Sequence, residues 1–219
     1  MNEEEIKAVI FDVDGTLYRS QEYERHLYHV IVKVISQFTG LEIQQAAEKL
    51  RQQKHKHRTV SRSIESMGID RYEFFNKLAE YAEPQLYIPR NPEVVDVLRE
   101  LRRRGYKVAL HTNSGRKLAE KVLAAIGVEE DCYDVLVSSD DAEPKPSHDG
   151  YLLCVSKLGV KTHEALYVGD RPEVELKPAK EIGMKTALIN STSSEEYIDY
   201  NLRTLSDILN ILAKGKMHT

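Results

Sequence analysis

Short apolar segments alternate with amphipathic helical segments along most of this 219-residue chain. A helix that joins two such segments returns the chain to the edge where the first strand began, so that successive strands run parallel. The alternation therefore predicts an α/β fold, with a doubly wound parallel sheet forming a Rossmann-like core. The segments that we expect as strands are residues 6–11, 106–111, 135–138, 165–168 and 185–189.

Residues 20–85 interrupt this alternation. Apolar positions in this stretch recur at helical spacing, as at Tyr23 and Leu27, and the stretch contains no strand pattern. We therefore expect an α-helical module at residues 20–85, inserted into a main domain made of residues 1–19 and 86–219.

The composition excludes several classes of protein. The chain has 41% hydrophobic and 30% charged residues and a formal net charge of −4, which disfavours general nucleic-acid binding. No apolar run approaches the roughly 18 residues of a membrane span, and the start Met-Asn-Glu-Glu-Glu is unlike a signal peptide. Cys132 and Cys154 form no C-x-x-C pair. We expect a cytoplasmic protein with no membrane or nucleic-acid partner, and the sequence favours neither a monomer nor a homodimer.

Two carboxylates directly follow the first predicted strand, in the sequence Asp12-Val13-Asp14-Gly15-Thr16. Acids this close repel each other and raise a pKa unless a cation lies between them. Such oxygen ligands suit Mg²⁺, which usually keeps several waters and contacts its substrate through phosphate oxygens. A solvated acidic turn is the alternative interpretation. We prefer the functional one, because the pattern D-x-D-G-T arises by chance on the order of 10⁻³ times in a chain this long.

Polar residues also follow three later strands. Thr112-Asn113-Ser114 ends the second strand, Lys145 lies in the loop after the third, and Asp170 follows the fourth. Ligands of doubly wound sheets bind outside the carboxyl ends of the strands, so we expect these side chains to meet the two acids there. Each one alone has an ordinary explanation, such as a capping residue or a solvated lysine. Together they predict a metal site with a phosphate-binding cradle.

With these motifs in this order, the chain resembles the haloacid dehalogenase-like (HAD) superfamily over nearly its whole length, in the phosphatase branch with a helical (C1-type) cap. The resemblance implies that Asp12 is the nucleophile and forms an aspartyl-phosphate. It implies that Asp14 protonates the leaving alkoxide and then deprotonates water. Thr112 would bind the phosphoryl oxygens, and Lys145 would neutralise charge on the nucleophile and the phosphoryl group. The implied Mg²⁺ is held by Asp12, the carbonyl of Asp14 and Asp170.

The fourth motif departs from the pattern of the family, in which a second Asp follows Gly-Asp after three or four residues. An acid with a longer arm ends the motif here, which runs Gly169-Asp170-Arg171-Pro172-Glu173-Val174-Glu175. Two roles are open for Glu175, which either belongs to the metal site, directly or through a water, or holds Lys145. We include it among the candidate metal residues and rank Glu173 behind it.

The resemblance implies an Mg²⁺-dependent hydrolase for a small phosphomonoester, with a nucleotide, phosphoglycolate and a sugar phosphate all open. Arg19 and Asn113 are expected to contact the substrate beside the motif residues. A phosphomutase would use the same residues, whereas a dehalogenase would need neither the metal nor Asp14. A non-catalytic binding protein should have lost one of the key acids or the lysine, and this chain keeps them. The basic run at residues 54–58 is expected to be a solvated helix face.

Overall fold

The computed structural model describes residues 5–215, so that residues 1–4 and 216–219, at the two ends of the expected core, lie outside the description. Its described strands form a six-stranded parallel sheet in the order β3-β2-β1-β4-β5-β6. The strands are β1 (Ala8–Phe11), β2 (Lys107–His111), β3 (Val135–Val137), β4 (Ala165–Gly169), β5 (Lys185–Ile189) and β6 (Tyr200–Leu202).

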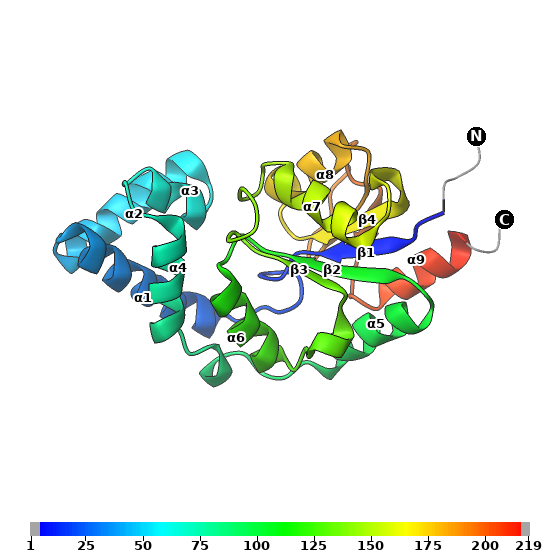
Figure 1. Ribbon diagram of the computed structural model, residues 1–219, viewed down its shortest axis with the longest axis horizontal. Helices are drawn as coiled ribbons and strands as arrows, with labels where there is room; N and C mark the ends of the chain where they lie inside the picture. Colours follow the sequence, from blue (N-terminus) through cyan, green and yellow to red (C-terminus); the bar gives the residue numbers. More distant parts are fainter. Residues whose placement is uncertain (1–4, 216–219) are drawn as a thin grey trace.

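Helices cover both faces of the sheet, as Figure 1 shows. Alternate residues of β1 face the two layers: Val9 and Phe11 belong to one apolar cluster, and Ala8 and Ile10 belong to the other. Because both faces are covered, β1 is buried throughout. The predicted doubly wound α/β fold is confirmed. One layer contains α5 (Pro92–Arg103), α6 (Arg116–Ile126) and α9 (Asp207–Gly215), and the other contains α7 (Asp149–Leu158) and α8 (Lys177–Glu181).

Four helices extend to one side of the sheet (Figure 1) and enclose an apolar cluster of their own. Leu118 of α6 packs into this cluster, and Lys121 donates hydrogen bonds to the carbonyl oxygens of Ala79 (2.7 Å) and Ala82 (2.5 Å). Helix α6 is therefore one part of the core that these helices contact. They lie within the stretch expected as a cap, although its bounds of 20–85 stay a prediction. These four, called the cap helices or the cap below, are α1 (Gln21–Thr39), α2 (Ile43–His57), α3 (Val60–Glu65) and α4 (Arg71–Tyr81).

Local sequence signals start and end the helices that flank the expected boundary. Ser20 accepts a hydrogen bond from the backbone N–H of Tyr23 and caps the N-terminus of α1. Gly40, with φ of 70°, ends the same helix in the left-handed conformation. Asn91 caps α5 by accepting from the N–H of Val94. The capping residue Ser20 therefore marks where the chain leaves the sheet, and Asn91 marks where it returns.

The sheet differs from the expectation at one edge. The sixth strand, β6, was not predicted, because only three residues pair with β5 and they carry no periodic pattern. Strands β1 and β2 each begin later than expected, at Ala8 and Lys107. Short helical turns occur at Pro84–Leu86, Glu130–Cys132 and Thr162–Glu164, with a π-helical turn at Pro172–Leu176.

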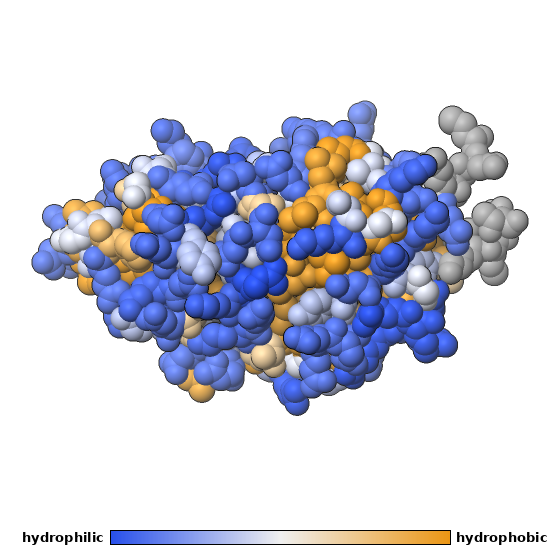
Figure 2. All heavy atoms as spheres, viewed as in Figure 1, coloured by the Kyte–Doolittle hydropathy of each residue, from blue (hydrophilic) through white to orange (hydrophobic). Residues whose placement is uncertain are grey.

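Hydrophilic side chains cover most of the face in Figure 2, with apolar ones gathered beside the sheet. Large exposed apolar residues are scattered, for example Phe38 and Ile43 in the cap helices and Leu152 on α7. Within residues 5–215, none of the helices combines the length and the apolar character that crossing a membrane requires.

Candidate active site

The predicted site residues meet at the carboxyl edge of the sheet. Asp12 follows β1, Thr112 follows β2 and Asp170 follows β4, and these are neighbouring strands in the sheet. Lys145 comes from the loop between β3 and α7, and its ammonium nitrogen lies 2.5 Å from a carboxylate oxygen of Asp12. The parallel register, in which Phe11 pairs with both neighbouring strands, brings together groups that are distant in sequence.

Asp12 lies at the bottom of the site and is only 2% exposed. Its Oδ1 contacts Lys145, and its Oδ2 accepts a hydrogen bond from the hydroxyl of Thr16 (3.0 Å). Burial, together with the negative charge of Glu175, raises the pKa of Asp12 to about 7, although the charge of Lys145 opposes this shift. The ionised form of this carboxyl group therefore needs more positive charge than the lysine supplies.

Lys145 is fully buried, and its ammonium group is surrounded by acceptors. Besides Asp12, it donates to the carbonyl oxygen of His111 (3.2 Å), the hydroxyl of Tyr167 (3.2 Å) and the carboxylate of Glu175 (3.3 Å). Burial, followed by the charge of Lys145, holds the pKa of the His111 ring well below its usual range. This histidine is therefore a neutral packing residue beside the lysine.

Glu175 lies beneath the site and has every carboxylate oxygen occupied. One oxygen accepts from the guanidinium of Arg171 (2.6 and 2.9 Å) and from Lys145, and the other accepts from the backbone N–H groups of Asp170 (3.1 Å) and Arg171 (3.2 Å). Burial acts to raise the pKa of Glu175, but Lys145 and Arg171 outweigh it and the pKa is lowered. Glu175 therefore contacts Lys145, which is one of the two roles left open by the sequence, and its place among the metal ligands stays a prediction.

Three carboxylates lie close enough to share a cation. Asp12, Asp170 and Glu175 each offer an oxygen, and these oxygens lie within 4.8 Å of one another. Oδ1 of Asp170 is buried and has no hydrogen-bond partner among the described residues. Burial and the charge of Glu175 raise the pKa of Asp170. A buried, unpartnered carboxylate oxygen beside a second acid fits a hard divalent cation such as Mg²⁺.

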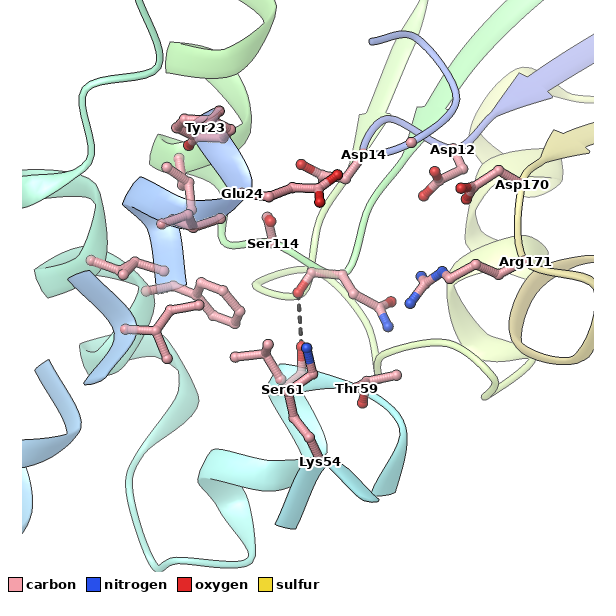
Figure 3. A pocket seen from close by; sticks show the side chains of 18 of the residues that line it. Asp12, Asp14, Tyr23, Glu24, Lys54, Thr59, Ser61, Ser114, Asp170 and Arg171 are labelled. Carbon is pink, nitrogen blue, oxygen red and sulfur yellow. Dashed lines mark hydrogen bonds between the residues drawn. The ribbon is translucent and has the colours of Figure 1, made fainter. Parts of the chain in front are cut away.

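The second acid of the first motif also lines the pocket. Asp14 accepts hydrogen bonds from the hydroxyl of Tyr18 (2.6 Å) and from the hydroxyl of Thr112 (3.1 Å). Thr112 in turn accepts from the backbone N–H of Ser114 (3.0 Å). Figure 3 shows Asp14 between Asp12 and Glu24 of α1.

Two residues expected to contact the substrate have other partners here. The Asn113 side chain accepts from the backbone N–H of Lys145 (2.7 Å) and donates to its carbonyl oxygen (3.0 Å). Arg19 lies 3.3 Å from Asp170 and also donates to the carbonyl oxygen of Gly15 (3.4 Å). Asn113 still lines the pocket, so substrate contact stays a prediction for both residues.

A cavity of about 360 Å³ lies between the carboxylates and the cap helices. Its polar lining from the cap includes Glu24, Lys54 and Ser61, which Figure 3 shows around the cavity. The hydroxyl of Tyr23 is buried there and has no partner among the described residues. Lys54 belongs to the basic run that we expected to be solvated, and it reaches this cavity. The apolar part of the lining comes from Leu27, Ile31, Val60, Phe75, Leu78 and Leu118.

Several residues of the site were not found from the sequence. Arg171 lines the pocket and pairs with Glu175, and its position directly after Asp170 is the only signal that could have indicated it. Tyr167 is an ordinary strand residue in the sequence. Asn190 donates to the carbonyl oxygen of Gly15 (2.8 Å) from the end of β5, a contact that no motif predicts.

Known proteins are similar to this chain over most of its length. The family model for haloacid dehalogenase-like hydrolases matches residues 6–183, and the chain belongs to this family. A glyceraldehyde 3-phosphate phosphatase of Methanopyrus kandleri is 26% identical over 95% of this chain and 99% of its own length. The pyrophosphatase PpaX of Halalkalibacterium halodurans is 27% identical over 95% of this chain and 97% of its own length.

A solved structure is similar as well. The HAD phosphatase from Thermococcus onnurineus superposes with a TM-score of 0.70 at 25% identity, covering 94% of this chain and 98% of its own. The predicted class, a HAD-type phosphatase, is confirmed by these relatives.

Proposed function

We propose that this protein is an Mg²⁺-dependent phosphatase that hydrolyses a small phosphate ester through an aspartyl-phosphate on Asp12. The observation that carries the proposal is the pairing of Asp12 with Lys145 at 2.5 Å, beneath a cavity that Asp14 also lines. An anionic nucleophile held by a buried ammonium group can approach a phosphate dianion with less repulsion.

In the first step, a carboxylate oxygen of Asp12 attacks phosphorus, and the bond from phosphorus to the leaving oxygen breaks. Asp14 gives its proton to that oxygen, and the alcohol departs. In the second step, Asp14 takes a proton from water, whose oxygen attacks phosphorus and releases inorganic phosphate and the Asp12 carboxylate. The hydrogen bonds from Tyr18 and Thr112 fix the orientation of Asp14 for both transfers.

The donor set fits Mg²⁺, with carboxylates of Asp12 and Asp170 and the carbonyl of Asp14 as the proposed ligands. When bound, Mg²⁺ supplies positive charge that offsets the negative charge of the nucleophile and the phosphoryl group. Arg19 lies against Asp170 and helps to fix its carboxylate. Glu175 is proposed to contribute to the site by orienting Lys145 and Arg171.

The size and the lining of the cavity support the proposal that the substrate is small. Its volume of about 360 Å³ is at the small end of the range for ligand pockets. An apolar wall with a few polar groups, among them Tyr23, Glu24 and Lys54, suits a compact leaving group that carries its own polar substituents. The two kinds of relative named above act on substrates of this size, so glyceraldehyde 3-phosphate and pyrophosphate are the first compounds to test.

The test is phosphate release from a panel of phosphomonoesters and pyrophosphate, with Mg²⁺ and with chelator. We expect Mg²⁺-dependent release that falls at least about 10³-fold in Asp12→Asn. Asp131→Asn, which removes an exposed partner of Arg99, is the matched control and should keep full activity. A folded wild-type protein that releases no phosphate from any compound would contradict the proposal and favour a mutase or a binding protein.

A further inference from the structure

The backbone of Lys145 is held by one side chain. Asn113 bonds to both the N–H and the carbonyl oxygen of Lys145, at 2.7 and 3.0 Å. The ammonium group is buried with its acceptors, so a shift of the loop backbone would displace it from Asp12. The position of Lys145 therefore depends on the position of Asn113.

The cap reaches Asn113 from the opposite side of the cavity. The hydroxyl of Ser61, in the first turn of α3, donates to the carbonyl oxygen of Asn113 at 2.9 Å, the contact drawn as a dashed line in Figure 3. Ser61 is only 1% exposed, so water does not compete for this hydrogen bond. The N-terminus of α3 is itself fixed, because Thr59 accepts from the backbone N–H of Arg62.

A second contact joins the same helix to the same loop. Glu143, two residues before Lys145, lies 3.3 Å from Arg62 and 3.5 Å from Arg71. Arg71 is also paired with Glu65 at 2.6 Å, which keeps its guanidinium in place. Helix α3 and the start of α4 thus hold the loop on the N-terminal side of the lysine, while Ser61 acts through Asn113.

We propose that Ser61 and Arg62 are positioning residues, through which the cap holds Lys145 in its working position against Asp12. This inference rests on the proposed function, because it assigns the effect to the catalytic lysine. Neither residue needs to touch the reacting atoms. When α3 lies against the core, the lysine loop has both supports, and when the cap moves away it loses both. Phosphoryl transfer is then coupled to cap closure by hydrogen bonds to the lysine loop, in addition to the exclusion of water.

The first experiment compares Ser61→Ala with Ser63→Ala. Ser63 is a buried serine of the same helix, whose hydroxyl bonds to the carbonyl oxygen of Thr59 (2.6 Å) and not to the core. We expect Ser61→Ala to lower kcat about tenfold, the effect of one buried hydrogen bond, with KM changed less than about twofold. Ser61→Thr should restore most of kcat, and Ser63→Ala should stay near wild type.

Inhibition by vanadate separates this role from substrate contact, because vanadate occupies the phosphoryl site and carries no leaving group. We expect the inhibition constant for vanadate to rise in Ser61→Ala by the same factor by which kcat falls. We also expect this variant to lose the same fraction of kcat with every ester tested. An unchanged vanadate constant, or a loss that depends on the ester, would show that Ser61 contacts the leaving group and would overturn the inference.

Glu143→Gln tests the second contact independently and covers the case in which Ser61→Ala fails to fold. Its carboxylate is 47% exposed, so we expect a kcat loss of only about threefold. Raising the salt concentration should lower kcat of the wild type in the same way, because exposed ion pairs are screened. If the wild type is active and both Ser61→Ala and Glu143→Gln keep the kcat of the wild type, the inference is rejected and the proposed function remains intact.

Discussion

The carboxylate of Glu175 lies 3.3 Å from the ammonium nitrogen of Lys145, and both side chains are fully buried. Glu175 also accepts hydrogen bonds from Arg171 and from two backbone N–H groups at the end of β4. The longer arm of Glu, compared with Asp, is what lets one carboxylate reach the backbone of the β4 turn and the lysine at once. The glutamate that ends the unusual fourth motif therefore contacts both the lysine and the arginine.

Shortening the side chain of residue 175 should break some of these contacts. In Glu175→Asp the carboxylate moves back by one methylene, so that it cannot keep both the backbone contacts and the contact with Lys145. We expect kcat to fall about 10–100-fold and the free energy of unfolding to fall by about 3 kcal/mol, since a buried charge loses its partner. Steady-state kinetics and urea denaturation measure these effects. Glu173→Asp, at an exposed neighbouring acid, is the control, and equal behaviour of the two variants would refute this role.

Gly15 should tolerate no side chain. Its φ of 95° lies in the left-handed region, and a Cβ there would lie 2.4 Å from Oδ2 of Asp170. Gly40 has a similar φ of 70°, but nothing lies within 4 Å of its Cβ position. Both Gly→Ala changes should cost about 1 kcal/mol of backbone strain. Only Gly15→Ala should also lower activity, by about 100-fold or more, and raise the Mg²⁺ concentration needed for half-maximal rate. Comparable activity of the two variants would contradict this expectation.

The buried Asp12 should make the metal-free protein less stable as pH rises. The carboxyl ionises near pH 4 in the unfolded chain, whereas burial and Glu175 raise its pKa in the fold to about 7. Between these values the unfolded chain binds fewer protons, so stability falls with rising pH and the loss is complete above about pH 7.

Asp12→Asn removes this dependence. The difference in free energy of unfolding between Asp12→Asn and the wild type, both in chelator, should shift by about 3 kcal/mol in favour of the variant between about pH 4.5 and pH 8, because each pKa unit is worth about 1.4 kcal/mol. Urea denaturation at the two pH values tests this, and saturating Mg²⁺ should narrow the difference. A constant difference across this pH range would exclude a raised pKa of Asp12.

Lys121 should hold the end of helix α4 on the core. Its ammonium donates to the carbonyl oxygens of Ala79 and Ala82, where a helix carries unsatisfied acceptors and partial negative charge. We expect Lys121→Met to lower the free energy of unfolding by about 1–2 kcal/mol and to speed amide exchange in the last turn of α4. Lys117→Met, at an exposed position one turn earlier on α6, is the matched control. Amide exchange in α4 that is as slow in Lys121→Met as in the wild type would contradict this role.

Local patterns predicted most of the fold. Strands such as β1 are continuous apolar runs because both of their faces are covered, and caps such as Ser20 and Asn91 act through hydrogen bonds within a few residues. The strand β6 escaped prediction because its three residues owe their conformation to pairing with β5. That pairing is a property of the assembled sheet and leaves no period in the sequence.

For the site, the sequence indicated residues whose type and spacing have meaning by themselves. Asp12, Asp14 and Asp170 follow strands directly, and the parallel sheet brings strand ends together, so their convergence could be inferred in advance. The family could be inferred for the same reason. Arg171 gave no such signal, because a charged residue beside an acid is equally common on a solvated surface.

The sequence by itself determined the class of fold and the family, and it indicated the acids that we propose to carry the chemistry, since these depend on short-range patterns and on the order of motifs. Only the tertiary structure decided that Glu175 contacts Lys145, that the Asn113 side chain bonds to the backbone of that lysine and that Ser61 of α3 reaches Asn113. These contacts join residues that are distant in the sequence, and the largest separation is the 52 residues between Ser61 and Asn113. Hydrogen bonds act over about 3 Å, and no local pattern specifies which distant groups the packed chain will bring within that distance.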